Sequence, residues 1–141
     1  MKIEIVNKQK IKKVNLKKIK KILKEISSLL NLSSKKISFV LSDNRFIKEL
    51  NKKFFKRNSF TDVISFPLSD EIDKDYLGEV VVSVEEAMKE NNWEKELILY
   101  LVHGILHLLG FKDKKKKERI IMRKKEEEIM RCLFGRYNIN C

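Results

Sequence analysis

Proline and glycine are scarce in this chain of 141 residues, which holds one proline and four glycines. No tract rich in proline, glycine or serine interrupts the sequence, and no repeat with a period of about 20 to 50 residues is present. A linker between domains is therefore not expected. We expect residues 1–141 to form a single domain, which is long enough to bury a hydrophobic core of its own.

Cysteines and long apolar runs are also few. Cys132 and Cys141 form no C-x2-C pair, so a metal site closed by thiolates is not expected. The longest apolar run, residues 97–110, is shorter than the roughly 20 residues that cross a bilayer, and the first ten residues lack the apolar segment of a signal peptide. These features predict a cytoplasmic protein without a membrane partner.

Acidic residues are outnumbered by basic ones, 20 against 32, which gives a net charge of +12. The first 36 residues alone hold twelve lysines and two glutamates. Such an excess suits a phosphate-rich partner such as RNA. Lysine also outnumbers arginine 26 to 6, however, as biased codon use would produce, so charge alone leaves nucleic-acid binding open.

The only two histidines, His103 and His107, stand four residues apart. On a helix this spacing places both imidazoles on one face, as a pair of metal ligands. Gly110 can then take a positive φ and end the helix, so that Asp113 turns back as a third ligand, in the pattern H-x3-H-x5-D. Three protein ligands are typical of a catalytic zinc site, in which the fourth position holds water.

The alternative is that His103 and His107 are hydrogen-bonded core histidines, because residues 97–109 are apolar almost all round and predict a buried helix. Each buried imidazole needs a hydrogen-bond partner or a metal. The joint placement of two histidines, a helix-ending glycine and a trailing carboxylate favours the metal.

Apolar periodicity predicts nine elements of secondary structure. Strands are expected at residues 2–6, 36–42, 61–67 and 77–84. Helices are expected at residues 16–30, 45–53 (with Asp43 as its cap), 85–92, 94–109 and 114–134. The order predicts an α+β fold of layered α/β type, a four-stranded mixed sheet packed with about five helices. The histidine helix should lie against the sheet, with its ligands open at an end or edge.

Two further motifs accompany the histidine run, TDVISFP at residues 61–67 and LGEVVVS at residues 77–83. With these three motifs in this order, residues 1–134 resemble the YbeY family of endoribonucleases and rRNA maturation factors. The resemblance implies a zinc-dependent endoribonuclease for single-stranded RNA, with one Zn²⁺ held by His103, His107 and Asp113. It also implies a role in ribosomal RNA maturation and ribosome quality control, with ribosomal RNA and proteins of the ribosomal subunit as partners.

The metal run departs from the family pattern H-G-x-L-H-L-x-G-Y-D-H. The third histidine of the pattern falls on Asp113, and the aspartate before it falls on Lys112. Asp113 adds a full negative charge, so the metal centre, ion and ligands together, would carry about +1 instead of +2, and the ion would act as a weaker Lewis acid. We therefore expect reduced activity, or activity shifted to higher pH.

A second departure lies before Thr61, where the family shows an arginine after an aromatic residue and a proline next to the threonine. Those positions are Phe55 and Phe60 here. Arg57 is the candidate to replace the arginine and hold a scissile phosphate through its planar guanidinium. The alternative is a surface arginine in a basic loop.

Two other functions stay open at this point. A non-catalytic RNA- or ribosome-binding factor with a structural metal would share the basic chain and the ligands. A minimal metalloprotease-like hydrolase would share the ligand spacing, but Gly104 stands where such proteases carry a glutamate base. No catalytic base is assigned. Strand alternation puts Asp62 and Ser65 on opposite faces of the strand, and Glu79 is expected to be a buried or cross-strand-paired residue.

Overall fold

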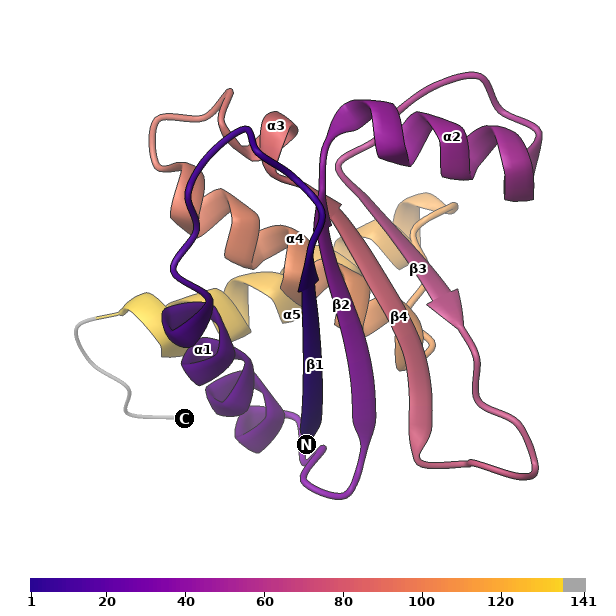
Figure 1. Ribbon diagram of the computed structural model, residues 1–141. Helices are drawn as coiled ribbons and strands as arrows, with labels where there is room; N and C mark the ends of the chain where they lie inside the picture. The colour runs from indigo at the N-terminus through magenta and orange to yellow at the C-terminus, as the bar shows by residue number, and fades with distance from the viewer. Residues whose placement is uncertain (136–141) are drawn as a thin grey trace.

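The computed structural model describes residues 1–135 (Figure 1). Within them the elements run β1 (Lys2–Asn7), α1 (Leu16–Leu29), β2 (Lys36–Ser42), α2 (Asn44–Phe55), β3 (Val63–Pro67), β4 (Tyr76–Ser83), α3 (Val84–Ala87), α4 (Trp93–Leu108) and α5 (Lys116–Phe134). The described residues thus hold four strands and five helices, and the predicted α+β class is confirmed.

The four strands form one mixed sheet in the order β1-β2-β4-β3. β1, β2 and β4 are parallel to one another, whereas β3 pairs with β4 in the antiparallel sense. β3 is therefore an edge strand, and Ser65 and Phe66 on it point to opposite faces of the sheet.

Helices cover both faces of the sheet. Figure 1 shows α1, α4 and α5 on one side and α2 on the other. The larger core, which includes Leu23, Val80 and Leu101, lies under the three helices, and a smaller one around Ile47 and Val81 lies under α2. Neighbouring residues of β4 therefore belong to different cores, as expected for a strand buried on both faces.

Most element bounds agree with the sequence pattern, but the helix predicted at residues 85–92 is too long. α3 ends at Ala87, and the side chain of Asn92 instead caps α4 by accepting a hydrogen bond from the Lys95 N–H at 3.4 Å. The cap predicted at Asp43 is confirmed, since its Oδ1 accepts from the Phe46 N–H at 2.9 Å. Asn92 therefore begins the next helix instead of ending the previous one, and apolar periodicity does not indicate such a cap.

No helix in the part of the chain that the structure describes is both long and apolar enough to cross a membrane. The apolar α4 spans 16 residues. Of the two cysteines, Cys132 lies on α5, and Cys141 lies outside the described residues.

Candidate metal centre

Helix α4 carries both histidines and lies against β3 and β4, as predicted. The helix and the sheet lie close together at Gly104, where a Cβ atom would clash with the side chain of Val80 and lie 3.2 Å from Ser65 Oγ. The Ser65 hydroxyl donates to the carbonyl oxygen of Gly104 at 2.8 Å. This contact fixes the helix on the edge strand, and with it the positions of His103 and His107.

The loop after α4 brings Asp113 back to the histidines. Gly110 has a φ of +98°, as the helix-ending prediction required, and its N–H donates to the His107 carbonyl at 3.0 Å. Farther along, the Arg119 guanidinium on α5 donates to the carbonyl oxygens of Lys114 at 2.6 Å and Asp113 at 3.4 Å. The loop is therefore held at both ends.

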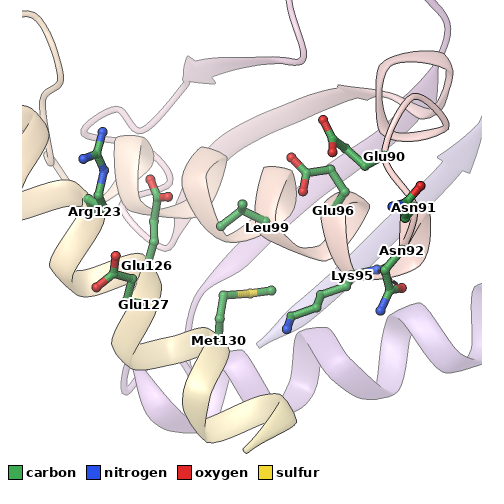
Figure 2. A pocket seen from close by; sticks show the side chains of 10 residues that line it. All are labelled: Glu90, Asn91, Asn92, Lys95, Glu96, Leu99, Arg123, Glu126, Glu127 and Met130. Carbon is green, nitrogen blue, oxygen red and sulfur yellow. Dashed lines mark hydrogen bonds between the residues drawn. The ribbon is translucent and has the colours of Figure 1, made fainter.

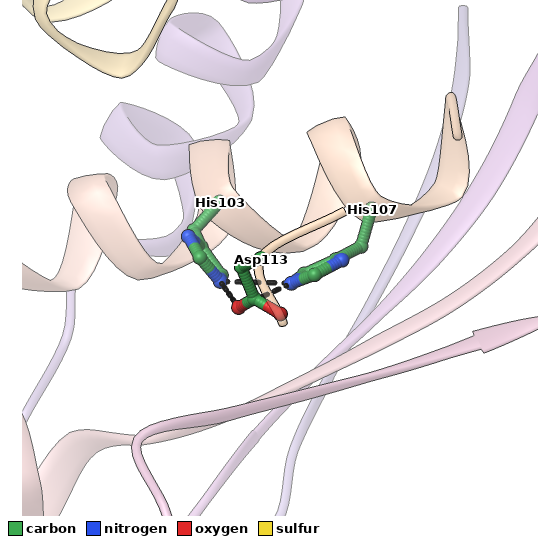
Figure 3. A group of neighbouring side chains, drawn as sticks. All are labelled: His103, His107 and Asp113. Carbon is green, nitrogen blue, oxygen red and sulfur yellow. Dashed lines mark hydrogen bonds and ion pairs between the residues drawn. The ribbon is translucent and has the colours of Figure 1, made fainter. Parts of the chain in front are cut away.

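The three predicted ligands converge on one point (Figure 3). The Nε2 atoms of His103 and His107 are 2.9 Å apart. Oδ2 of Asp113 lies 3.3 Å from His103 Nε2 and 3.1 Å from His107 Nε2. Sequence spacing alone proposed this group, and the fold brings all three residues together.

The triangle has the size of a metal coordination shell. Ligand atoms at the tetrahedral zinc distance of about 2.0 to 2.1 Å from the ion would lie roughly 3.3 Å apart. Two imidazole nitrogens and a carboxylate oxygen are also suitable ligands for zinc. The residues present therefore fit a divalent cation, although their role as ligands stays a prediction.

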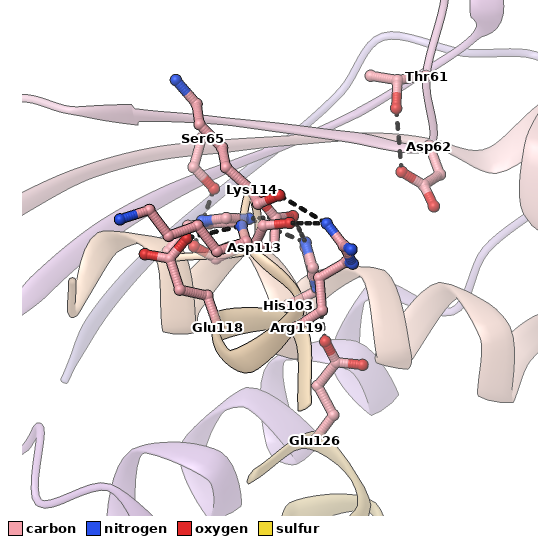
Figure 4. Close-up of polar contacts among 12 residues, drawn as sticks. Thr61, Asp62, Ser65, His103, Asp113, Lys114, Glu118, Arg119 and Glu126 are labelled. Atoms are coloured by element: carbon pink, nitrogen blue, oxygen red, sulfur yellow. Dashed lines mark hydrogen bonds and ion pairs between the residues drawn. The ribbon is translucent and has the colours of Figure 1, made fainter. Parts of the chain in front are cut away.

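A fourth residue, Glu126 on α5, supports the group from behind (Figure 4). Nδ1 of His103 lies 2.6 Å from Glu126 Oε1. Because an ionised carboxylate only accepts hydrogen bonds, the imidazole proton belongs on Nδ1, and the Nε2 lone pair is free to face His107 and Asp113. Such a carboxylate behind a ligating histidine is a common part of metal sites.

The sequence reasoning missed Glu126, which stands in a run of three glutamates. The available signal was its register. Met122 and Ile129 are buried, so Glu126 is a charged residue on the apolar stripe of α5, where its side chain is only 16% exposed.

The electrostatic surroundings also hold a proton on His103. Burial lowers its pKa, but the hydrogen bond to Glu126 and the charges of Glu126, Asp113 and Asp62 outweigh burial, so that the pKa is raised above the ordinary value of 6.5. A metal at this centre must therefore compete with a proton for His103.

One cavity borders the three candidate ligands, a second reaches only Glu126 behind them, and the charges of the two cavities differ. One of about 380 Å³ is lined by His107 and Asp113 together with Lys112, Lys114, Lys115 and Glu118. Another of about 540 Å³ lies between α4 and α5, and Figure 2 shows Glu90, Glu96, Glu126 and Glu127 around it. Three lysines against Asp113 and Glu118 suit a phosphate in the first cavity, whereas the four carboxylates of the second outnumber its two cations, Lys95 and Arg123.

Asp62 and Glu79 differ in their relation to the group. The face predicted for Asp62 was wrong. Strand alternation does not apply to it, because Asp62 lies at a bend before β3 begins. Its charge is among those that raise the pKa of His103 on α4. Burial raises the pKa of Tyr100 on α4, and Asp62 is among the carboxylates that raise it further. Glu79 alternates with Val80 on β4 and faces the α2 side, away from the histidines.

Arg57 lies in the exposed loop between α2 and β3, where its backbone N–H donates to the Asn51 carbonyl at 3.1 Å. Its predicted contact with a phosphate stays a prediction. Phe60 in the same loop is 48% exposed, and Lys89 Nζ lies 5.3 Å from the centroid of its ring.

Comparison with known proteins decides the family. Residues 2–133 match the family described as Endoribonuclease YbeY. The chain belongs to this endoribonuclease family. The resemblance inferred from the three sequence motifs is thereby confirmed.

Several YbeY relatives are similar over nearly the whole chain, and their name denotes a hydrolytic enzyme. Endoribonuclease YbeY of Syntrophus aciditrophicus is 34% identical over 96% of this chain and 91% of its own length. The Carboxydothermus hydrogenoformans protein of the same name is 40% identical over 69% of this chain and 71% of its own. A solution structure of a Thermotoga maritima protein superposes with a TM-score of 0.65 at 28% identity, covering 94% of this chain and 89% of the other.

Proposed function

We propose that this chain is a zinc-dependent endoribonuclease that hydrolyses single-stranded RNA in ribosomal RNA maturation and ribosome quality control. The observation that carries the proposal is the convergence of His103, His107 and Asp113 within a member of the YbeY family. Ribosomal RNA, proteins of the ribosomal subunit and a cytoplasmic location follow from the family resemblance, and residues 1–141 are proposed to act as one domain.

The proposed ion is one Zn²⁺ per chain, held by the two imidazoles and the carboxylate. A bound divalent cation would supply Lewis acidity and lower the pKa of a coordinated water. Asp113 is the residue that distinguishes this chain, because its charge reduces the net charge of the loaded centre from about +2 to about +1. Lower activity at neutral pH is the proposed consequence.

The remaining residues of the site are proposed to hold the substrate and orient the ligands. Glu126 accepts the Nδ1–H of His103 at 2.6 Å and so keeps its Nε2 directed to the centre. Lys112, Lys114 and Lys115 line the cavity next to Asp113, where their ammonium groups favour an RNA phosphate. Arg57 remains the candidate for a bidentate contact to the scissile phosphate.

The close packing at Gly104 argues against a minimal metalloprotease. That family of enzymes needs a glutamate directly after the first histidine. In this chain even a Cβ at Gly104 would clash with Val80, so the position faces the sheet and offers no room for a catalytic carboxylate.

The deciding experiment measures metal content and RNA cleavage in the same preparation. We expect close to one zinc per chain, cleavage of a single-stranded ribosomal RNA fragment, loss of cleavage with a chelator and its recovery with added zinc. RNA binding without metal-dependent cleavage would contradict the proposal and support a non-catalytic binding factor with a structural metal. Absence of metal would overturn both.

A further inference from the structure

Two neighbouring phenylalanines at the end of α2 are unusually exposed. Phe54 is 55% and Phe55 is 48% exposed. Neither belongs to the buried cluster beneath α2, which is formed by Val40, Ile47, Ile64 and Val81. The core on this side of the sheet is therefore complete without them, and two phenyl rings remain in contact with water.

The two rings are arranged around a third one on the edge strand. The ring of Phe55 is stacked on that of Phe66, with a centroid distance of 5.9 Å and an interplanar angle of 19°. Phe54 meets Phe66 edge-on at 5.3 Å. We call Phe54, Phe55 and Phe66 the aromatic surface. Because Phe66 is held in β3 by pairing with β4, the rings are ordered before any partner binds.

The segment that carries Phe54 and Phe55 is basic, although Glu79, the β4 partner of Phe66, lies on the same face of the sheet. Residues 50–60 contain Lys52, Lys53, Lys56 and Arg57 and no acidic residue. Lys53 Nζ lies 5.3 Å from the centroid of the Phe54 ring. Protein-protein interfaces are depleted of lysine, whereas surfaces for single-stranded nucleic acid combine aromatic rings for the bases with cations for the backbone. The composition therefore favours RNA over a protein partner.

The topology places this surface next to the candidate metal centre. Ser65 points to α4 and contacts Gly104, beside His103, while the adjacent Phe66 points to α2. A single edge strand thus separates the two sites, and no further strand or helix pairs with its outer side in the described sheet. An RNA strand can pass around this edge from one face to the other.

We propose that the aromatic surface stacks unpaired bases of the RNA and that the strand continues around β3 to the metal centre. The inference rests on the proposed function, because it names where that substrate is held. It also gives a role to Phe55, which stands where the family resemblance places an arginine: stacking replaces a charged contact, and the neighbouring lysines and Arg57 retain the positive charge.

The test measures the affinity for a fluorescein-labelled oligouridylate by anisotropy, with a chelator present to prevent cleavage. Phe55→Leu keeps an apolar side chain but removes the flat ring, and we expect about tenfold weaker binding. The dependence of affinity on salt should not change, because no phosphate contact is lost. Phe55→Trp restores a ring and should bind at least as tightly as the wild type.

Phe134→Leu is the matched control. Phe134 is 44% exposed at the end of α5, and Lys95 Nζ lies 5.7 Å from the centroid of its ring, so it shares exposure and a nearby cation but not the location. We expect its affinity for RNA to equal that of the wild type. Thermal unfolding of each variant checks that the fold is kept.

Three results would overturn the proposal. One is an affinity of Phe54→Leu/Phe55→Leu within about twofold of the wild type, and another is no binding of oligouridylate by the wild type. The third is a wild-type oligomer that Phe55→Leu dissociates, which would make the surface an interface between copies of the chain. Failure of the proposed function is distinct from all three, since metal-loaded protein would then bind RNA through the aromatic surface without cleaving it.

Discussion

The edge strand β3 separates two groups of side chains that differ in exposure. On the α4 side, Ser65 is hydrogen-bonded to Gly104, and the polar atoms of the candidate centre lie 2.6 to 3.3 Å from one another. On the α2 side, Phe54 and Phe55 are about half exposed and the neighbouring charges are open to solvent. The hydrogen-bonded group on the α4 side has the fixed geometry that a metal site requires, whereas the exposed rings on the α2 side offer a surface for recognition.

The difference predicts that single substitutions on the α4 side strongly reduce metal binding and cleavage, whereas those on the α2 side reduce RNA affinity by smaller steps. The largest effect is expected for Asp113→Ala, which removes a proposed ligand. Metal content should fall, and cleavage should fall by more than about 100-fold, since even residues behind the ligands are worth 10- to 100-fold. Lys114→Ala, the next residue, is the control and should retain the metal. Equal retention in both variants would mean that Asp113 is not the third ligand.

Glu126→Gln tests the support behind His103. The amide keeps the size of the side chain but loses its charge, so we expect a 10- to 100-fold weaker metal affinity in a titration with a competing chelator. Glu127→Gln removes the same charge from the neighbouring exposed position and should have little effect. Similar affinities for both variants would show that the hydrogen bond to His103 does not tune the centre.

Metal affinity should decrease as the pH is lowered. His103 has a raised pKa, so as pH decreases through that pKa the proton displaces the metal, at about tenfold in affinity per pH unit for one proton. In the metal-free protein the stability of the fold changes in the opposite direction. The protonated imidazole paired with Glu126 stabilises the fold, and this contribution is lost as the pH rises through the pKa of His103. Zinc occupancy measured across pH checks the first effect; occupancy independent of pH would contradict it.

Gly104→Ala tests the close packing between α4 and β3. The added Cβ clashes with Val80, and overpacking of this kind costs about 1–3 kcal/mol of unfolding free energy, measured by chemical denaturation. Phe60→Leu, in the exposed loop before β3, should change stability by less than about 0.5 kcal/mol. A neutral Gly104→Ala would mean that the helix is not fixed on the strand as described.

The smallest effect is expected for Asp113→His, which restores the family residue. The loaded centre regains about one positive charge, so cleavage should rise roughly severalfold at neutral pH. Rates must be compared at equal zinc occupancy. A variant that binds zinc without a gain in rate would refute the argument from charge.

The fold and the ligands could be predicted because their signals are local. The spacing of His103 and His107, the φ of Gly110 and the cap at Asp43 depend on residues within a few positions of one another, and the structure confirms the geometry of each. The helix predicted at residues 85–92 ends earlier, at Ala87, and Asn92 caps the following helix, which periodicity alone does not indicate.

The sequence by itself determined the helical spacing of the histidines, the turn that returns Asp113 and the excess of lysine, since each is a property of neighbouring residues or of composition. Tertiary structure decided that Glu126 lies behind His103, 23 residues away in sequence, and that Phe66 meets Phe54 and Phe55 on the face of β3 opposite the candidate metal centre. Such contacts depend on how helices pack on the sheet, and packing is set by the whole core instead of by any one segment.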